Sequence, residues 1–207
     1  MAKIIKHIYI ANSSLFVDGN LVLKGESPIF VQFLKEIYKF LQIKYPKYYK
    51  MDTLSKLGFI ASEVLLQDQE IDAAEERLGI VLGNRASTFI VDTKHQESIN
   101  DRGAYFPSPA NFVYTLPNVM TGEICIRNHF KGENAVYIME AFDMVFLTNI
   151  VNLLFAANKV DMLVSGFVNA DEDDYEAFLF LAEKNGVNSI DNKEIERIYH
   201  GLNEKCK

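Results

Sequence analysis

The chain has 207 residues, of which 49% are hydrophobic, and its net charge is −7 at pH 7. This length predicts one domain, residues 1–207, with a substantial core, and the acidic charge argues against nucleic acid as a partner. The first ten residues contain no long apolar segment, and the longest nearly apolar run, within 144–157, is too short to span a bilayer. With only two cysteines and no disulfide framework, we expect a cytoplasmic protein.

Two strands and a helix are predicted near the N-terminus. The runs Ile4–Val17 and Leu21–Leu23 have strand composition, and Asp18-Gly19-Asn20 between them is a strong hairpin signal. Ser27-Pro28 predicts the start of a helix, with the serine as its cap. Apolar residues then recur at helical spacing: Phe30, Phe33, Leu34, Ile37, Phe40 and Leu41.

A basic segment follows in this otherwise acidic chain. Lys47 and Lys50 either form a docking patch for an acidic partner or a phosphate, or belong to an ordinary solvated surface. Asp52 or Thr53 can cap a second helix. The buried face of that helix is predicted from six apolar residues: Leu54, Leu57, Ile60, Ala61, Val64 and Leu65.

The middle of the chain alternates between loops and short elements. The acidic segment Gln67–Arg77 predicts a loop with a helical turn, Leu78–Gly83 a strand, and Ser87–Ile99 a helix. Ser108-Pro109 predicts the start of another helix, which Pro117 interrupts because proline lacks the amide hydrogen that a helix interior needs.

A strand–helix–strand pattern occupies residues 134–169. Ala135–Met139 and Val160–Val168 have strand character, and Phe142–Asn158 is a helix with one polar seam at Thr148 and Asn152. This pattern predicts parallel strands joined by a right-handed crossover. Because the helix is otherwise apolar all round, we expect it to be covered on both sides.

The C-terminal segment 171–186 predicts an acidic-capped helix followed by a mixed tail. The histidines are scattered, and none has a metal-binding or catalytic spacing to a cysteine, so we expect no metal and no cofactor. They are His7, His95, His129 and His200.

Three motifs carry a resemblance to a known family. Residues 131–134 (KGEN) precede the strand–helix–strand pattern, residues 161–166 (DMLVSG) form its second strand, and residues 108–122 have the spacing S-P-x-x-F-x-x-T-x-x-N-x-x-x-G. Together, over about residues 48 to 170, they resemble the β-ketoacyl synthases, and especially the short ketoacyl-synthase N-terminal-like group, which has Ser-Val where this chain has Thr115-Leu116. The resemblance implies an α/β, thiolase-like half: a three-layer mixed sheet with a buried central helix after the strand at about 135–139.

The resemblance also places a catalytic position. In the family, a nucleophilic cysteine follows the glycine of the first motif by nine residues and precedes the aspartate of the second by twenty. Counting from Gly132 and from Asp161 leads to the same residue, Ala141, whose methyl group cannot attack a thioester. We expect Ala141 at the junction between an inner strand and an enclosed helix.

Carboxylates flank this position. Glu140 and Asp143 can form a general acid–base pair, or Asp143 can simply cap the helix. The candidate pocket or interface comprises Asn118, Glu140, Ala141, Phe142 and Asp143.

Three functions are compatible with the resemblance. One is a non-catalytic β-ketoacyl-synthase-like subunit that partners an active synthase in fatty-acid, polyketide or polyene-type synthesis. The second is an acyl-transfer or condensing enzyme completed by a partner chain, and the third is an α/β binding or scaffold protein. Cys125 is either a relocated nucleophile or a buried structural cysteine.

The resemblance further implies partners. A lone half of the thiolase fold would leave the 142–158 helix exposed on one side, so we expect a homodimer or a heterodimer with a ketosynthase-like chain. Such an interface would bury more than about 2,000 Å². An acyl carrier protein is a further possible partner, with Lys47 and Lys50 as its candidate docking residues.

Overall fold

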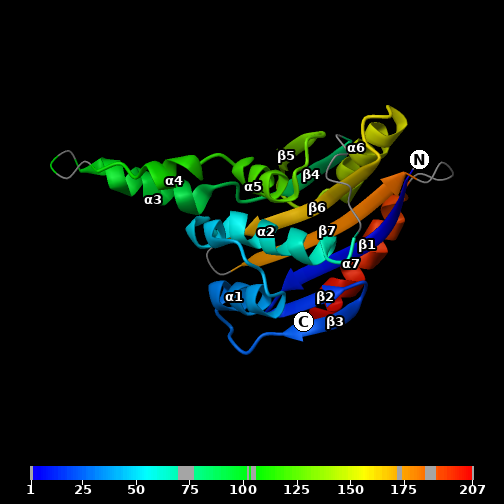
Figure 1. The fold of residues 1–207 in the computed structure, drawn as a ribbon, viewed down its shortest axis with the longest axis horizontal. Helices are drawn as coiled ribbons and strands as arrows, with labels where there is room; N and C mark the ends of the chain where they lie inside the picture. Colours follow the sequence, from blue (N-terminus) through cyan, green and yellow to red (C-terminus); the bar gives the residue numbers. More distant parts are fainter. Residues whose placement is uncertain are drawn as a thin grey trace.

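A mixed seven-stranded sheet in the order β3-β2-β1-β7-β6-β4-β5 organises the chain (Figure 1). The structure is a computed structural model, and it describes residues 2–69, 77–101, 103, 106–171, 174–184 and 190–206. The strands are β1 (Ala2–Ala11), β2 (Ser14–Val17), β3 (Asn20–Lys24), β4 (Leu78–Asn84), β5 (Asn134–Ile138), β6 (Met162–Ala170) and β7 (Tyr175–Lys184). The helices are α1 (Phe30–Phe40), the 3-10 helix η1 (Pro46–Lys50), α2 (Thr53–Leu66), α3 (Phe89–Asn100), α4 (Pro109–Val113), α5 (Val119–Asn128), α6 (Met144–Ala156) and α7 (Asn192–Cys206).

The N-terminal strands form an antiparallel meander rather than one long strand and a hairpin. The prediction of a single strand over Ile4–Val17 is wrong, because the chain turns at Asn12 and Ser13, which have φ angles of 47° and 51°. Left-handed backbone at two successive residues gives the tight turn that suits twisted hairpins. The second turn, at Asp18-Gly19, is confirmed.

The central strand–helix–strand prediction is confirmed in its strand directions. Strands β5 and β6 each pair in parallel with β4, which lies between them. The strand β5 is therefore at the edge of the sheet, so the expectation that Ala141 follows an inner strand is wrong for the single chain.

The helix predicted over 171–186 is wrong for the described residues of that segment. The described part forms β7, which pairs antiparallel with both β1 and β6 and is buried on both faces from Ala177 to Ala182. A strand covered on both faces has a continuous apolar sequence, which periodicity alone does not separate from a buried helix. The predicted mixed tail is instead largely the helix α7.

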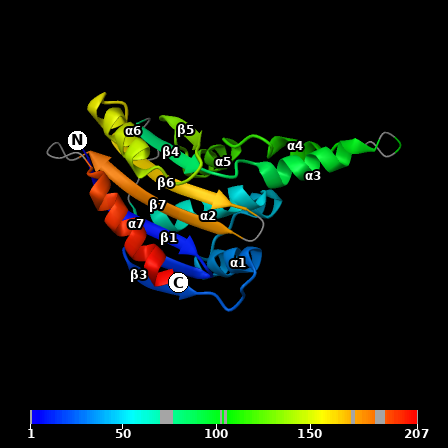
Figure 2. The same cartoon turned by 180° about the vertical axis from the view of Figure 1, so that it is seen from behind.

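The sheet is the middle of three layers. Helices α1, α2 and α5 pack on one face, and α6 and α7 pack on the other, as Figure 2 shows from behind. The predicted three-layer α/β architecture is therefore confirmed. Helix α6 packs on this face through Leu147, Val151 and Phe155, and the Asn152 side chain of its polar seam exchanges two hydrogen bonds with the backbone of Ile190, just before α7.

The most enclosed helix is α2 and not α6. Of the fourteen residues of α2, eleven are buried between the sheet, α1 and α5. In α6 only one face is buried, and Val145 and Leu153 are 53% and 60% exposed. The expectation that α6 is covered on both sides is therefore wrong for the single chain. An exposed outer face on this helix is what the resemblance implied for a lone half of the fold.

Several helix boundaries follow the predicted chemistry. The Asp52 carboxylate accepts hydrogen bonds from the N–H groups of Leu54 and Ser55 and so caps α2. Ser108 caps α4, and Pro117 lies in the break between α4 and α5.

Of two further predictions, one is wrong and the other falls mostly on residues outside the described part of the chain. Ser27 does not cap α1, because its hydroxyl accepts from the Ile29 N–H and the helix begins at Phe30. Most of the predicted loop Gln67–Arg77 lies outside the described residues.

Helices α3 and α4 lie side by side and extend away from the sheet as an arm (Figure 1). Within the described part of the chain, none of the helices has the length and apolar character needed to cross a membrane.

Candidate functional site

The loop between β5 and α6 contains the predicted catalytic position. Ala141 lies in this connection with its side chain exposed, as does Glu140. The Asp143 carboxylate accepts a hydrogen bond of 2.8 Å from the Phe146 N–H, so it caps α6. This contact supports the capping alternative for Asp143, and no hydrogen bond joins Asp143 to Glu140 among the described residues.

Phe142 connects this loop to the core. Its ring lies 5.5 Å from that of Phe167 on β6, 5.7 Å from that of Phe178 on β7 and 5.0 Å from that of Tyr199 on α7. Ring pairs at such distances stabilise their mutual orientation. The side chain after Ala141 therefore fixes the loop against two strands and the C-terminal helix.

Two buried asparagines hold the loop that follows β4. Asn84 donates from Nδ2 to the Val168 backbone carbonyl at 2.7 Å, its side-chain Oδ1 accepts from the Ser87 N–H, and its backbone carbonyl accepts from the Met139 N–H at 2.9 Å. Asn169 accepts from the Ala86 N–H at 2.8 Å. Sequence reasoning did not assign these residues to the site, although each is a polar residue at or next to the end of an apolar strand.

A carboxylate–tyrosine cluster lies beside Phe142. The Tyr199 and Tyr9 hydroxyls donate to the Glu176 carboxylate at 2.9 and 3.3 Å. Burial raises the pKa of Glu176, and the two tyrosine hydrogen bonds oppose that rise. No sequence motif indicated this cluster, because its members come from β1, β7 and α7.

The other predicted site residues lie on separate elements. Asn118 immediately precedes α5 and is exposed, and no hydrogen bond or ion pair joins it to residues 140–143 among those described. The Lys47 ammonium lies 2.8 Å from the carboxylate of Glu123, whose side chain is only 5% exposed. Lys50 has no ion pair within the described chain and lines a surface groove.

Comparison with solved structures identifies the fold, whereas comparison with sequences does not. No protein-family profile matches the sequence, and no curated protein does. A solved structure described as "The ishigamide ketosynthase/chain length factor" superposes with a TM-score of 0.66 at 16% identity, over 90% of this chain and 63% of its own. A β-ketoacyl synthase from Burkholderia phymatum STM815 gives 0.61 at 9% identity, over 100% of this chain and 61% of its own.

A third structure, described as a type II PKS acyl-carrier protein in complex with its ketosynthase, gives 0.58 at 11% identity, over 95% of this chain and 64% of its own. The chain has the ketosynthase-like thiolase fold. It spans less than two thirds of the length of each of these three structures.

Within this ketosynthase-like fold, the internal thiol is not activated. Cys125 lies on α5, where its sulfur accepts a hydrogen bond of 3.3 Å from Asn134 Nδ2. Burial raises the pKa of the Cys125 thiol to about 11. Because the thiolate is the nucleophilic form, a raised pKa disfavours Cys125 as a nucleophile at neutral pH.

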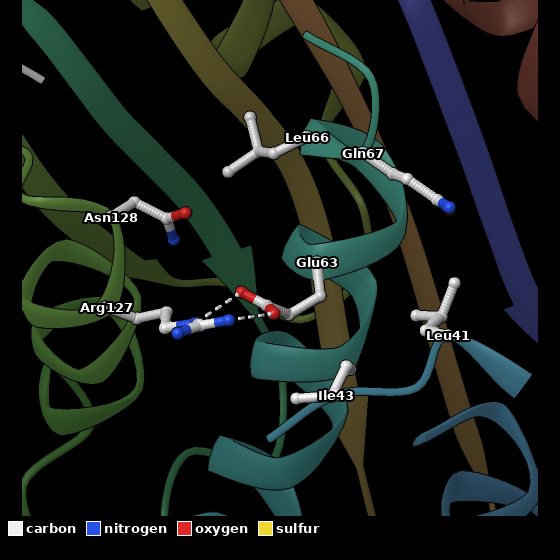
Figure 3. A pocket seen from close by; sticks show the side chains of 7 residues that line it. All are labelled: Leu41, Ile43, Glu63, Leu66, Gln67, Arg127 and Asn128. Atoms are coloured by element: carbon white, nitrogen blue, oxygen red, sulfur yellow. Dashed lines mark hydrogen bonds and ion pairs between the residues drawn. The ribbon is translucent and has the colours of Figure 1, made fainter. Parts of the chain in front are cut away.

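A cavity of about 270 Å³ opens between the ends of α1, α2 and α5, and Figure 3 shows the side chains that line it. In this cavity the Arg127 guanidinium forms two hydrogen bonds with the Glu63 carboxylate, at 3.1 and 3.0 Å, and lies 5.3 Å from the ring centroid of Tyr45. The pair satisfies both charged groups. The cavity is lined by none of the predicted site residues.

Proposed function

We propose that this chain is a non-catalytic ketosynthase-like subunit that supports an active synthase in fatty-acid, polyketide or polyene-type acyl chain synthesis. The observation that carries the proposal is Ala141 in the β5–α6 loop, where the motif spacing of the ketosynthases puts the nucleophilic cysteine. A methyl group has no lone pair with which to attack a thioester. The raised pKa of the half-buried Cys125 thiol supports the view that it does not replace the missing nucleophile.

The outer surface of the β5–α6 unit supports pairing with another chain. Strand β5 is an edge strand, and Ile138 at its end is 51% exposed. On α6, Val145, Phe146 and Leu153 are 53%, 37% and 60% exposed. An open strand edge beside an apolar helix face favours association. We infer that the partner is a ketosynthase-like chain or a second copy of this chain, and one structural neighbour is itself described as a ketosynthase/chain length factor.

Docking of an acyl carrier protein at Lys47 and Lys50 is part of this proposal. Another neighbour is described as a complex of a ketosynthase with an acyl-carrier protein, which supports this choice of partner. The two lysines are nevertheless not equivalent here, because the ammonium of Lys47 is paired with the buried Glu123 carboxylate.

The first experiment tests the absence of covalent catalysis. The protein is incubated with acyl-carrier-protein thioesters of several chain lengths and its intact mass is measured. We expect no acyl adduct on this chain, alone or with an active synthase added. An adduct on Cys125 or on any other residue of the chain would refute a non-catalytic role.

The second experiment tests pairing. Sedimentation at micromolar concentration is expected to show a dimer, or a complex with an added ketosynthase chain. Leu153→Glu is expected to weaken that association by at least tenfold, because it places a charge in the apolar surface. Lys193→Glu, an exposed change on α7, is the control and is expected to have no effect. A protein that is monomeric and binds no ketosynthase chain would refute the proposed partnership.

A further inference from the structure

Two adjoining cavities lie at the base of the α3–α4 arm, on the α1–α2 side of the sheet. The larger, of about 460 Å³, is lined by residues of α1, α2, α3, β7 and the segment after β6. The smaller, of about 130 Å³, lies between η1, α2, α3 and α4. Thr53 and Lys94 line both cavities, so the two form one continuous groove, which we call the arm groove.

The larger part of the arm groove is mainly apolar. Ile29 and Val31 at the start of α1 are 60% and 36% exposed, and Ile90 of α3 lines the same cavity. The Phe30 ring is stacked on the Tyr175 ring with centroids 3.9 Å apart, a contact that stabilises this wall. A concave apolar surface of this volume suits the hydrocarbon part of a small molecule.

The rim of the arm groove is basic. Lys94 and Lys50 line it, and neither ammonium has an ion pair or a hydrogen bond among the described residues. Lys56 lies close enough to Lys94 and Lys35 for their charges to interact. Burial lowers the pKa of Lys56, and the positive charges of Lys35 and Lys94 lower it further, whereas Asp52 raises it.

Two carboxylates also line the arm groove, and they do not cancel its charge. The Asp52 carboxylate is engaged by the N–H groups at the start of α2, and Asp171 lies at the opposite end of the groove. Lys50 and Lys94 therefore line the groove with two aspartates, and the charge of Lys56 acts on Lys94 from nearby, in a chain whose net charge is −7. This local excess of positive charge next to an apolar wall is complementary to a molecule with one anionic end and one hydrocarbon end.

We propose that the arm groove binds a free amphipathic carboxylate, with its anionic group at Lys94 and the Thr53 hydroxyl and its hydrocarbon chain against Ile29, Val31 and Ile90. A single small molecule fits better than an acidic protein segment, because the apolar wall is concave and most of the groove volume lies beside it. The site lies on the opposite face of the sheet from α6, so it is independent of the pairing proposed above.

The experiment uses decanoate below its micellar concentration as the probe, with decanol and inorganic phosphate as comparison ligands. Binding to the full chain is followed by calorimetry and by amide chemical shifts. We expect decanoate to bind at least tenfold more tightly than decanol or phosphate, with affinity falling as salt rises. Lys94→Glu and Ile90→Asp are each expected to weaken decanoate binding at least tenfold.

The matched control is Lys193→Glu, which makes the same charge change on α7 at an exposed lysine and is expected to leave binding unchanged. All variants are first shown to have the wild-type unfolding midpoint and amide spectrum, and Lys94→Gln replaces Lys94→Glu if the latter does not fold. Equal binding of decanol, equal weakening by Lys193→Glu, or no weakening by the Lys94 variant would overturn the proposal. Tighter binding of a polyglutamate peptide than of decanoate would assign the groove to an acidic protein segment and would also overturn it.

Discussion

Gly166 on β6 lies so close to Phe178 on β7 that any side chain at residue 166 would collide with the Phe178 carbonyl oxygen. Gly166 also has a φ angle of 142°, in a region that residues with side chains rarely adopt. The glycine of the DMLVSG motif is thus explained by strand packing, because β6 and β7 approach each other closely where Gly166 pairs with Leu179.

Replacing Gly166 by alanine is expected to destabilise the protein by about 2–4 kcal/mol, since backbone strain and overpacking in the core add together. Urea denaturation provides the measurement. Gly122→Ala is the matched control, because a methyl group there meets no atom within 4 Å and alanine favours the α5 helix. A wild-type midpoint for Gly166→Ala would contradict this account of the motif.

Loss of the Asp143 cap should lower the free energy of unfolding by less than the Gly166 substitution does. Asp143→Ala removes the hydrogen bond to the Phe146 N–H and is expected to cost about 1 kcal/mol in the free energy of unfolding. Asp143→Asn should retain most of that stability, because an asparagine side chain is also a good cap. Glu140→Ala, in the same exposed loop but without a capping contact, is the control and should change stability by less than about 0.5 kcal/mol. Equal losses for Asp143→Ala and Glu140→Ala would argue against the cap.

Local signals in the sequence were sufficient for the elements whose chemistry is local. The Asp18-Gly19 turn, the Asp52 cap and the helix break at Pro117 each depend on residues a few positions apart, and the structure confirms all three. The three-layer architecture followed from a family resemblance carried by motifs such as DMLVSG, whose glycine is set by packing against Phe178.

The elements that sequence reasoning missed depend on distant partners. The run around Phe178 and Leu181 became a strand only because β1 and β6 cover its two edges. Likewise, α2 is more enclosed than the more apolar α6, because α1 and α5 lie over it. The Glu176 cluster was invisible for the same reason, since its tyrosines are 167 and 23 residues away in the chain.

A thiol placed at the catalytic position offers a test of the β5–α6 loop. Ala141→Cys puts a sulfur in an exposed loop, whereas Cys125 is half-buried with a pKa of about 11. We expect iodoacetamide at pH 8 to alkylate residue 141 at least about tenfold faster than Cys125, because reactivity follows thiolate content and exposure. Peptide mass spectrometry separates the two sites. Slower labelling at residue 141 than at Cys125 would contradict the exposed position of this loop.

The pH dependence of the free energy of unfolding should reflect the raised pKa of Glu176. Burial raises its pKa in the folded state above that in the unfolded state, so the folded protein binds more protons between these two values. Stability contributed by Glu176 is therefore greatest below the ordinary glutamate pKa and decreases as pH rises through the raised one. In Glu176→Gln, which keeps an oxygen acceptor for Tyr9 and Tyr199, this decrease should be absent. The free energies of unfolding of both proteins, measured from pH 4 upward, should diverge in favour of the variant, and parallel curves would contradict the prediction.

Substitutions of the two candidate docking lysines, Lys47 and Lys50, should have different effects on stability and on carrier-protein binding. Lys47→Ala leaves the buried Glu123 carboxylate without its cation and is expected to cost about 1–2 kcal/mol, less than for a fully buried pair because the Lys47 side chain is 45% exposed. Lys50→Ala breaks no ion pair with the residues that the structure describes and should change stability by less than about 0.5 kcal/mol. If an acidic carrier protein docks here, Lys50→Glu should weaken its binding several-fold while the unfolding midpoint stays unchanged. Lys47 variants would lower affinity only together with stability, so binding that is insensitive to Lys50→Glu at wild-type stability would exclude this surface as the docking site.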